Sequence, residues 1–141
     1  MYWHYTPTGA CILKRMKINS ISGYTCYVKD LDKTAAFYEA LGFRPGKRDG
    51  NTVTMYVNWF SVTFVSAPDE EKEAFKQEAN LEPRGGGLYI NIKVVGIDAF
   101  YQMVLDKGMK PSTEPRDWPS GNREFVLRDP DGYKLVFFDK K

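Results

Sequence analysis

The chain has 141 residues, 43% of them hydrophobic and 27% charged, with a formal net charge of +2 at pH 7. This size supports one compact core but leaves no room for a second independent domain. Acidic and basic residues nearly balance, so charge gives no reason to expect a nucleic-acid partner. No apolar run approaches the roughly 18 residues of a membrane-spanning helix, so no membrane partner is expected.

The beginning of the chain differs from the rest. Residues 1–15 carry the aromatic run Tyr2-Trp3-His4-Tyr5 and fit no element of the fold, so we expect them to form an arm outside it. The arm either packs its aromatic side chains on a partner or is not native and derives from an upstream start, and both remain open. The first ten residues lack the basic start and apolar centre of a signal peptide, and two cysteines cannot form a disulfide framework. We therefore predict a reducing, cytoplasmic location.

The first half of the chain predicts a β-α-β-β-β order. Residues 24–28 have the composition of a strand. Asp30 is placed to cap a helix whose apolar side chains recur at helical spacing, and Gly42 is placed to end it. Turn residues then separate three further strands, which we predict at 43–47, 52–57 and 60–65.

A charged segment, 68–85, separates the two halves. Residues 68–78 are rich in charged side chains of both signs and predict a short, solvated helix that acts as a linker. The run Arg84-Gly85-Gly86-Gly87 leads into a strand, whereas a phosphate-binding glycine loop leads from a strand into a helix. We therefore interpret this run as a flexible hinge.

The second half repeats the first. The phrase Val28-Lys29-Asp30-Leu31-Asp32 recurs as Val94-Val95-Gly96-Ile97-Asp98. We expect a strand at 88–94, a helix at 98–107, and strands at 123–128 and 133–138 that flank the turn Asp129-Pro130-Asp131-Gly132. A repeat of this size indicates a duplicated βαβββ unit, with a longer loop at 113–121 in the second copy.

Three phrases carry a resemblance to a known family. They are Tyr27-Val28-Lys29-Asp30-Leu31, the segment 37–43 (FYEALGF) and Arg128-Asp129-Pro130-Asp131-Gly132. Together they resemble the vicinal oxygen chelate superfamily, which holds glyoxalase I, extradiol dioxygenases and bleomycin-resistance proteins. The resemblance covers roughly residues 18–138. It implies an α+β domain at 16–141, in which modules 18–67 and 86–139 form a curved eight-stranded mixed sheet with helices on the outer face, and it implies a homodimer.

The resemblance also says where metal ligands would lie. In the metal-dependent members they are carried on the first and fourth strands of each module, at positions that correspond here to Gly23, Thr63, Tyr89 and Val136. None of these is a usual ligand, and the chain's single histidine, His4, is in the arm. A carboxylate site for Mg or Mn built from Glu82, Glu114 and Glu124 remains conceivable. We predict neither a metal nor another cofactor, and no metal-dependent lyase or dioxygenase activity.

Strand alternation assigns two faces to the expected sheet. The core face should carry Cys26, Val28, Val53, Met55, Val57, Phe60, Val62, Phe64, Ile90, Ile92, Val94, Phe125, Leu127, Leu135 and Phe137. The opposite face mixes aromatic and polar side chains, among them Val126, Lys134 and Val136, which is the composition of a small-molecule groove, although such a face can also meet water or a second subunit. Trp118, in the loop at 113–121, could close over a bound ligand or pack on its own loop. The candidate ligand-binding residues are Tyr27, Tyr56, Trp59, Tyr89, Asn91, Lys93, Trp118, Glu124 and Arg128.

Three functions are compatible with this groove. The chain could sequester a small, partly aromatic molecule such as an antibiotic, and Lys93, Arg128 and Lys134 favour a neutral or anionic one. It could be a metal-free enzyme that uses Tyr89, Lys93, Glu124 or Arg128 for acid–base chemistry. It could also be a non-catalytic subunit or regulatory module. Whether it is an enzyme is left open.

Overall fold

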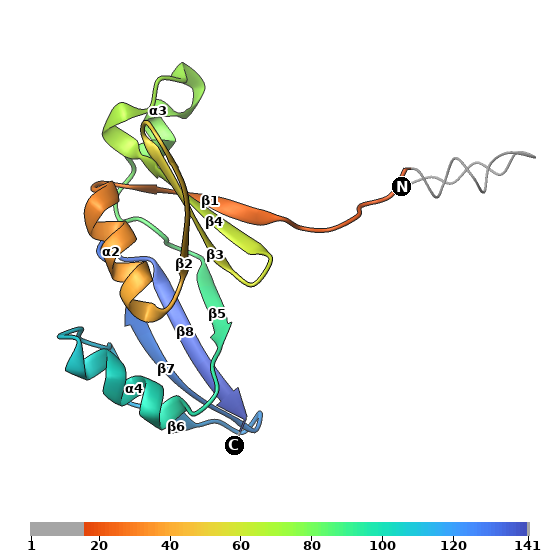
Figure 1. Cartoon of the computed structure of the whole chain (residues 1–141), viewed down its shortest axis with the longest axis vertical. Coiled ribbons are helices and arrows are strands. Elements are labelled where there is room, and N and C mark those ends of the chain that lie inside the picture. The colour runs from red at the N-terminus through yellow and green to blue at the C-terminus, as the bar shows by residue number, and fades with distance from the viewer. Residues whose placement is uncertain (1–15, 141) are drawn as a thin grey trace, which may run out of the picture.

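The computed structural model describes residues 16–140 (Figure 1), so the arm, with His4 and Cys11, lies outside the described residues. The first module contains β1 (Gly23–Val28), α2 (Leu31–Leu41), β2 (Arg44–Asp49), β3 (Thr52–Val57) and β4 (Phe60–Ser66). The linker forms η1 (Ala67–Asp69) and α3 (Glu73–Ala79). The second module contains β5 (Tyr89–Lys93), α4 (Ile97–Asp106), β6 (Arg116–Asp117), β7 (Asn122–Arg128) and β8 (Lys134–Lys140). The expected α+β class and the two βαβββ modules are confirmed.

The strands are hydrogen-bonded as two four-stranded mixed sheets, in the orders β1-β4-β3-β2 and β5-β8-β7-β6. In each sheet the first and last strands of the module pair in parallel, and the other pairs are antiparallel. Helices α2 and α4 lie along the same side of the molecule (Figure 1). Strand β6 falls in the segment that the sequence analysis treats as a loop, because a strand of two residues in a proline-flanked segment gives no strand pattern.

The ends of helix α2 follow from its flanking residues. The Asp30 carboxylate accepts a hydrogen bond from the Lys33 N–H at 3.0 Å, so it caps the first turn as predicted. Gly42 has φ of 111°, a left-handed conformation that favours glycine, and its N–H donates to the Glu39 carbonyl at 3.0 Å. The predicted start and end of this helix are confirmed.

One hydrophobic core runs through both modules and contains most of the residues predicted for the core face. Tyr38 packs on Phe64 with a ring distance of 4.7 Å, and Phe125 stacks on Phe137 at 5.2 Å. Two residues were assigned to the wrong environment. Val57 is 39% exposed because it ends β3 at a turn, whereas Val136 is only 6% exposed on β8, which is an inner strand of its sheet.

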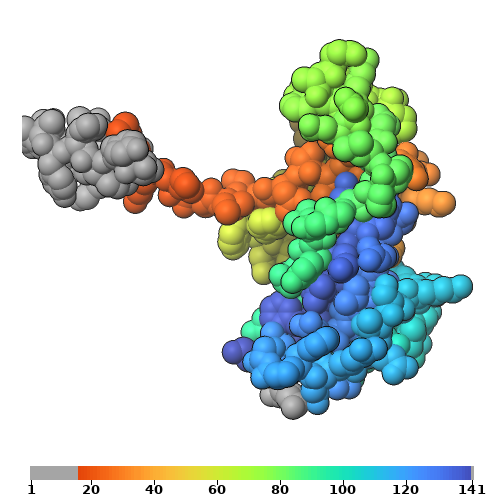
Figure 2. Space-filling model, turned by 180° about the vertical axis from the view of Figure 1, so that it is seen from behind, coloured from red at the N-terminus to blue at the C-terminus, as the bar shows by residue number. Residues whose placement is uncertain are grey.

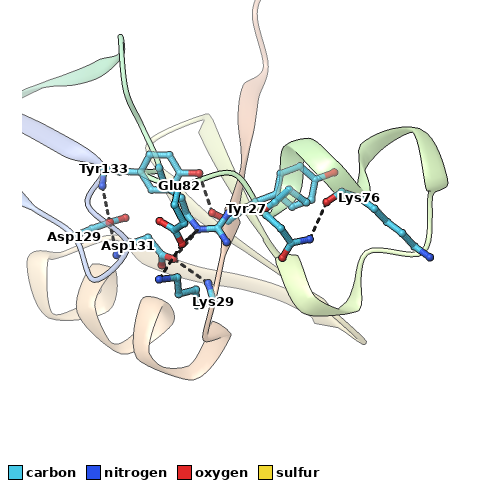
Figure 3. Close-up of polar contacts among 10 residues, drawn as sticks. Tyr27, Lys29, Lys76, Glu82, Asp129, Asp131 and Tyr133 are labelled. Atoms are coloured by element: carbon cyan, nitrogen blue, oxygen red, sulfur yellow. Dashed lines mark hydrogen bonds and ion pairs between the residues drawn. The ribbon is translucent and has the colours of Figure 1, made fainter.

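The turn between β7 and β8 joins the second module to the first (Figure 3). The buried Tyr38 hydroxyl donates to Asp129 Oδ2 at 2.7 Å, and the Lys29 N–H donates to Asp131 Oδ1 at 2.9 Å. The Tyr133 hydroxyl donates to the Tyr27 carbonyl at 2.8 Å. These contacts connect residues far apart in sequence, so the Asp129–Gly132 turn positions one module against the other. No helix among residues 16–140 is long and apolar enough to span a membrane.

Candidate ligand-binding site

The segment between α3 and β5 is packed at the junction of the modules, on the side shown in Figure 2. The Arg84 side chain is 5% exposed; its Nη1 donates to the Ala79 carbonyl, and its Nε lies 3.3 Å from Asp131 Oδ1, whose side chain is 3% exposed. Glu82 lies 3.8 Å from the same Nε and 2.9 Å from Lys29 Nζ. The interpretation of residues 84–87 as a free hinge is therefore wrong at Arg84.

Gly85 is packed as well. It has φ of +74°, and a Cβ there would lie 2.7 Å from the Tyr133 ring, so both backbone conformation and space require glycine. Gly86 and Gly87 differ, because a Cβ at either position would meet no atom within 4 Å. The segment therefore begins anchored and ends with exposed backbone.

A basic cavity of about 630 Å³ opens beside this segment. Tyr89 on β5 and Arg128 on β7 are both register partners of Lys134 on the intervening strand β8, so the three side chains form one row across the sheet. Lys134 Nζ lies 5.5 Å from the centroid of the Tyr89 ring, which is 55% exposed. The lining residues are Pro83, Arg84, Gly85, Gly86, Gly87, Leu88, Tyr89, Arg128 and Lys134.

A larger cavity of about 790 Å³ lies between the first sheet and α3 and is acidic. The Tyr27 hydroxyl donates to Glu70 Oε2 at 2.6 Å, and this hydrogen bond is the main cause that raises the pKa of Tyr27 to about 12 and lowers that of Glu70. The sequence analysis missed its acidic lining, because these residues come from a linker interpreted as solvated. Its charged lining residues are Asp69, Glu70, Glu71, Lys72 and Glu78.

A small cavity of about 260 Å³ connects the other two. It shares Tyr27 and Glu78 with the acidic cavity, and Pro83, Arg84, Gly85 and Gly86 with the basic one. The cavities thus follow the linker across the molecule, acidic at the α3 end and basic at the β5 end.

The structure does not bring the nine candidate residues together. Tyr27 lines the acidic and connecting cavities, and Tyr89 and Arg128 line the basic one. Tyr56 packs under the Arg44 guanidinium, 5.3 Å from its ring centroid, and Trp59 and Trp118 are exposed in turns. Six of the nine candidate residues line none of these three cavities: Tyr56, Trp59, Asn91, Lys93, Trp118 and Glu124.

Comparison with known proteins decides the family. The family model described as the glyoxalase/bleomycin resistance protein/dioxygenase superfamily matches residues 17–137. The chain belongs to this superfamily. No curated protein matches it significantly.

Solved structures of the superfamily share the fold of this chain. The bleomycin resistance determinant encoded on transposon Tn5 is 22% identical with a TM-score of 0.66, and the alignment covers 87% of this chain and 99% of that one. A superfamily protein from Nocardioides is 18% identical with a TM-score of 0.75, covering 93% and 91%. A bleomycin-binding protein complexed with bleomycin is 22% identical with a TM-score of 0.64, covering 87% and 100%. At these identities the likeness establishes the fold alone.

The positions at which superfamily members carry metal ligands do not fit a metal here. A Cβ at Gly23 would clash with the Ser61 carbonyl oxygen, so this position has no room for any side chain. Thr63 Oγ1 is hydrogen-bonded to Thr54 Oγ1 at 3.1 Å, and Val136 is apolar and buried. Residues 16–140 contain no group of three His, Cys, Asp or Glu side chains placed to hold a metal, so the conceived carboxylate site is not assembled.

Proposed function

We propose that this protein binds and sequesters a small, partly aromatic molecule of neutral or anionic charge at the basic cavity, an antibiotic being one such class. The observation that carries this proposal is the exposed Tyr89 ring, which stands in one row with Lys134 and Arg128. An aromatic plane beside hydrogen-bonding cations is the composition expected of a site that stacks a ring and orients a polar substituent. A bleomycin-binding protein shares this fold, which supports a role in binding a small molecule.

Replacing Tyr89 by alanine is expected to weaken binding of benzoate and benzyl alcohol about fivefold or more, because stacking between rings contributes about 1 kcal/mol. Titrations of ¹⁵N-labelled protein followed by NMR give the affinities and show which amides respond. Trp59→Ala is the control, since the Trp59 ring is also exposed but lines none of the three cavities. Equal affinities of wild type and Tyr89→Ala would contradict the proposed site.

A second candidate ligand is a cationic aromatic molecule in the acidic cavity. Four carboxylates and one lysine line it, and Tyr27 and Phe75 provide two rings. This arrangement differs from the neutral or anionic preference expected from the sequence. Benzylamine separates the candidates, because it should perturb amides near Phe75 if the acidic cavity is the site and amides near Tyr89 if the basic one is.

We further propose a homodimer in a reducing, cytoplasmic compartment. The Trp59 and Trp118 rings and half of Tyr89 are exposed, which supplies aromatic surface of the kind enriched at interfaces. Burial raises the pKa of the Cys26 thiol to about 12, so this free cysteine is suited to stay reduced. Native mass spectrometry of the full chain should give twice the polypeptide mass, with any retained ligand as an added increment. A monomer throughout the micromolar range would contradict the dimer.

A further inference from the structure

We infer that the basic cavity contains a subsite for an oxyanion, a phosphate or carboxylate group, held by Lys134, Arg128 and the glycine backbone that Arg84 anchors. The inference deepens the proposed function, because it names the ligand group that would lie beside Tyr89. It rests on three features of the cavity: the charge of its lining, its open backbone and the buried Arg84 side chain.

The charge of the lining is one-sided. Arg84, Arg128 and Lys134 line the cavity, and no carboxylate does. Arg84 is compensated by Asp131 and Glu82. The ion pairs found within residues 16–140 include neither Arg128 nor Lys134; Arg128 Nη1 donates only to the Gly132 carbonyl at 2.9 Å, and Lys134 lies over Tyr89. Two cations in the row therefore have no counter-charge, which an anionic ligand would supply.

The glycine backbone is open to the same cavity. Leu88 N–H donates to the Gly85 carbonyl at 3.3 Å and closes a turn, but no hydrogen bond among the described residues uses the N–H of Gly86 or Gly87. The absence of side chains and of nearby atoms at Gly86 and Gly87 lets a ligand oxygen approach these amides. Among residues 16–140, two N–H groups without a hydrogen bond and two cations without an ion pair therefore line the same cavity, which is the combination that an oxyanion requires.

The buried arginine provides independent support. Arg84 is more than nine-tenths buried, and its side chain lines both the basic and the connecting cavities. Its Nε faces Asp131 Oδ1 at 3.3 Å, and Glu82 also lies near it, so the charge of Arg84 is offset within the protein. Arg84 therefore fixes the start of the glycine segment beside Lys134 and Arg128, so the segment is ordered before a ligand binds.

The test compares four probes on the full chain: inorganic phosphate, phenyl phosphate, benzoate and neutral benzyl alcohol. Phenyl phosphate should bind at least about tenfold more tightly than benzyl alcohol, and inorganic phosphate should shift the Gly86 and Gly87 amide resonances. Lys134→Gln should remove most of this preference for the charged probe over the neutral one. If Lys134→Gln weakens the binding of phenyl phosphate more than that of benzoate, the subsite prefers a tetrahedral anion. The reverse order would assign a planar anion.

Two variants complete the design. Gly86→Ala places a methyl group over the exposed amides without a steric clash in the protein, so it should weaken phosphate binding in a folded molecule. Lys110→Gln removes an exposed charge that lines none of the cavities and should change nothing. Equal affinities for charged and neutral rings would overturn the oxyanion subsite but retain the proposed function. Phosphate shifts at Gly86 and Gly87 without any ring binding would support the subsite and refute the aromatic site.

Discussion

Replacing Asp129 by alanine is expected to lower the free energy of unfolding by about 4 kcal/mol and the melting temperature by roughly 10 °C. Asp129 accepts hydrogen bonds from the buried Tyr38 hydroxyl at 2.7 Å and from the Asp131 and Tyr133 N–H groups at 2.9 Å each. The alanine variant leaves these donors without a partner. Thermal and urea denaturation followed by circular dichroism measure the loss.

The matched control is Asp129→Asn, which keeps the size and the carbonyl acceptor. Its Oδ1 can accept from both backbone amides while its Nδ2 donates to the Tyr38 oxygen, so it should cost much less than the alanine variant. If the two variants were equally unstable, the lost hydrogen bonds would not be the cause.

The wild type and the Asp129→Asn variant together give a pH test. Burial is the main cause that raises the pKa of Asp129 above its ordinary value near 4, while the hydrogen bonds it accepts act in the opposite direction. The folded state therefore binds the Asp129 carboxyl proton more tightly than the unfolded state does. This proton binding stabilises the folded state fully below the ordinary pKa, and the stabilisation is lost as pH rises through the folded pKa. Between pH 3.5 and 7, wild type should lose stability relative to Asp129→Asn. A constant difference over this range would contradict the raised pKa.

The second large effect is expected at the linker. Replacing Arg84 by methionine removes the cation 3.3 Å from Asp131 and leaves that shielded carboxylate with only the Lys29 N–H as an observed donor. Breaking a buried ion pair by removing one partner costs about 3 kcal/mol or more, so the variant should unfold at clearly lower urea concentration.

A double-mutant cycle separates charge from packing at this pair. Asp131→Asn keeps the hydrogen bond from the Lys29 N–H but removes the negative charge. Arg84→Met combined with Asp131→Asn should therefore recover at least about 1 kcal/mol of the loss seen in Arg84→Met alone. Additive effects would show that Arg84 stabilises the junction through its packing and its contact with Ala79 rather than through its charge.

The repeat made the fold predictable, because each module carries its own local signals. Asp30 and Gly42 bound α2 where capping chemistry requires, and alternation placed Phe64 and Phe125 in the core. Val57 and Val136 were missed for one reason: alternation gives the face of a strand but not whether a residue ends the strand at a turn or lies on an inner strand of the sheet.

The candidate site was less predictable, because it depends on strand register and on the linker. Tyr89 and Arg128 were expected on one face, but only the pairing of both with Lys134 places them in one cavity. Arg84 was interpreted as part of a hinge, since a charged residue before three glycines carries no sequence sign of burial. Its burial arises from contacts with Ala79 and Asp131, which depend on how the modules dock.

The close contact at Gly23 bears on what a substitution there can achieve. The first side-chain atom of an introduced histidine or glutamate would clash with the Ser61 carbonyl oxygen, within a parallel strand pair that continues from Gly23–Ser61 to Val28–Ser66. Placing a metal-binding side chain at this position thus requires the β1 and β4 backbones to separate first. One substitution at Gly23 is therefore not enough to build a ligand there, and an engineered metal site would need a compensating change in β4 as well.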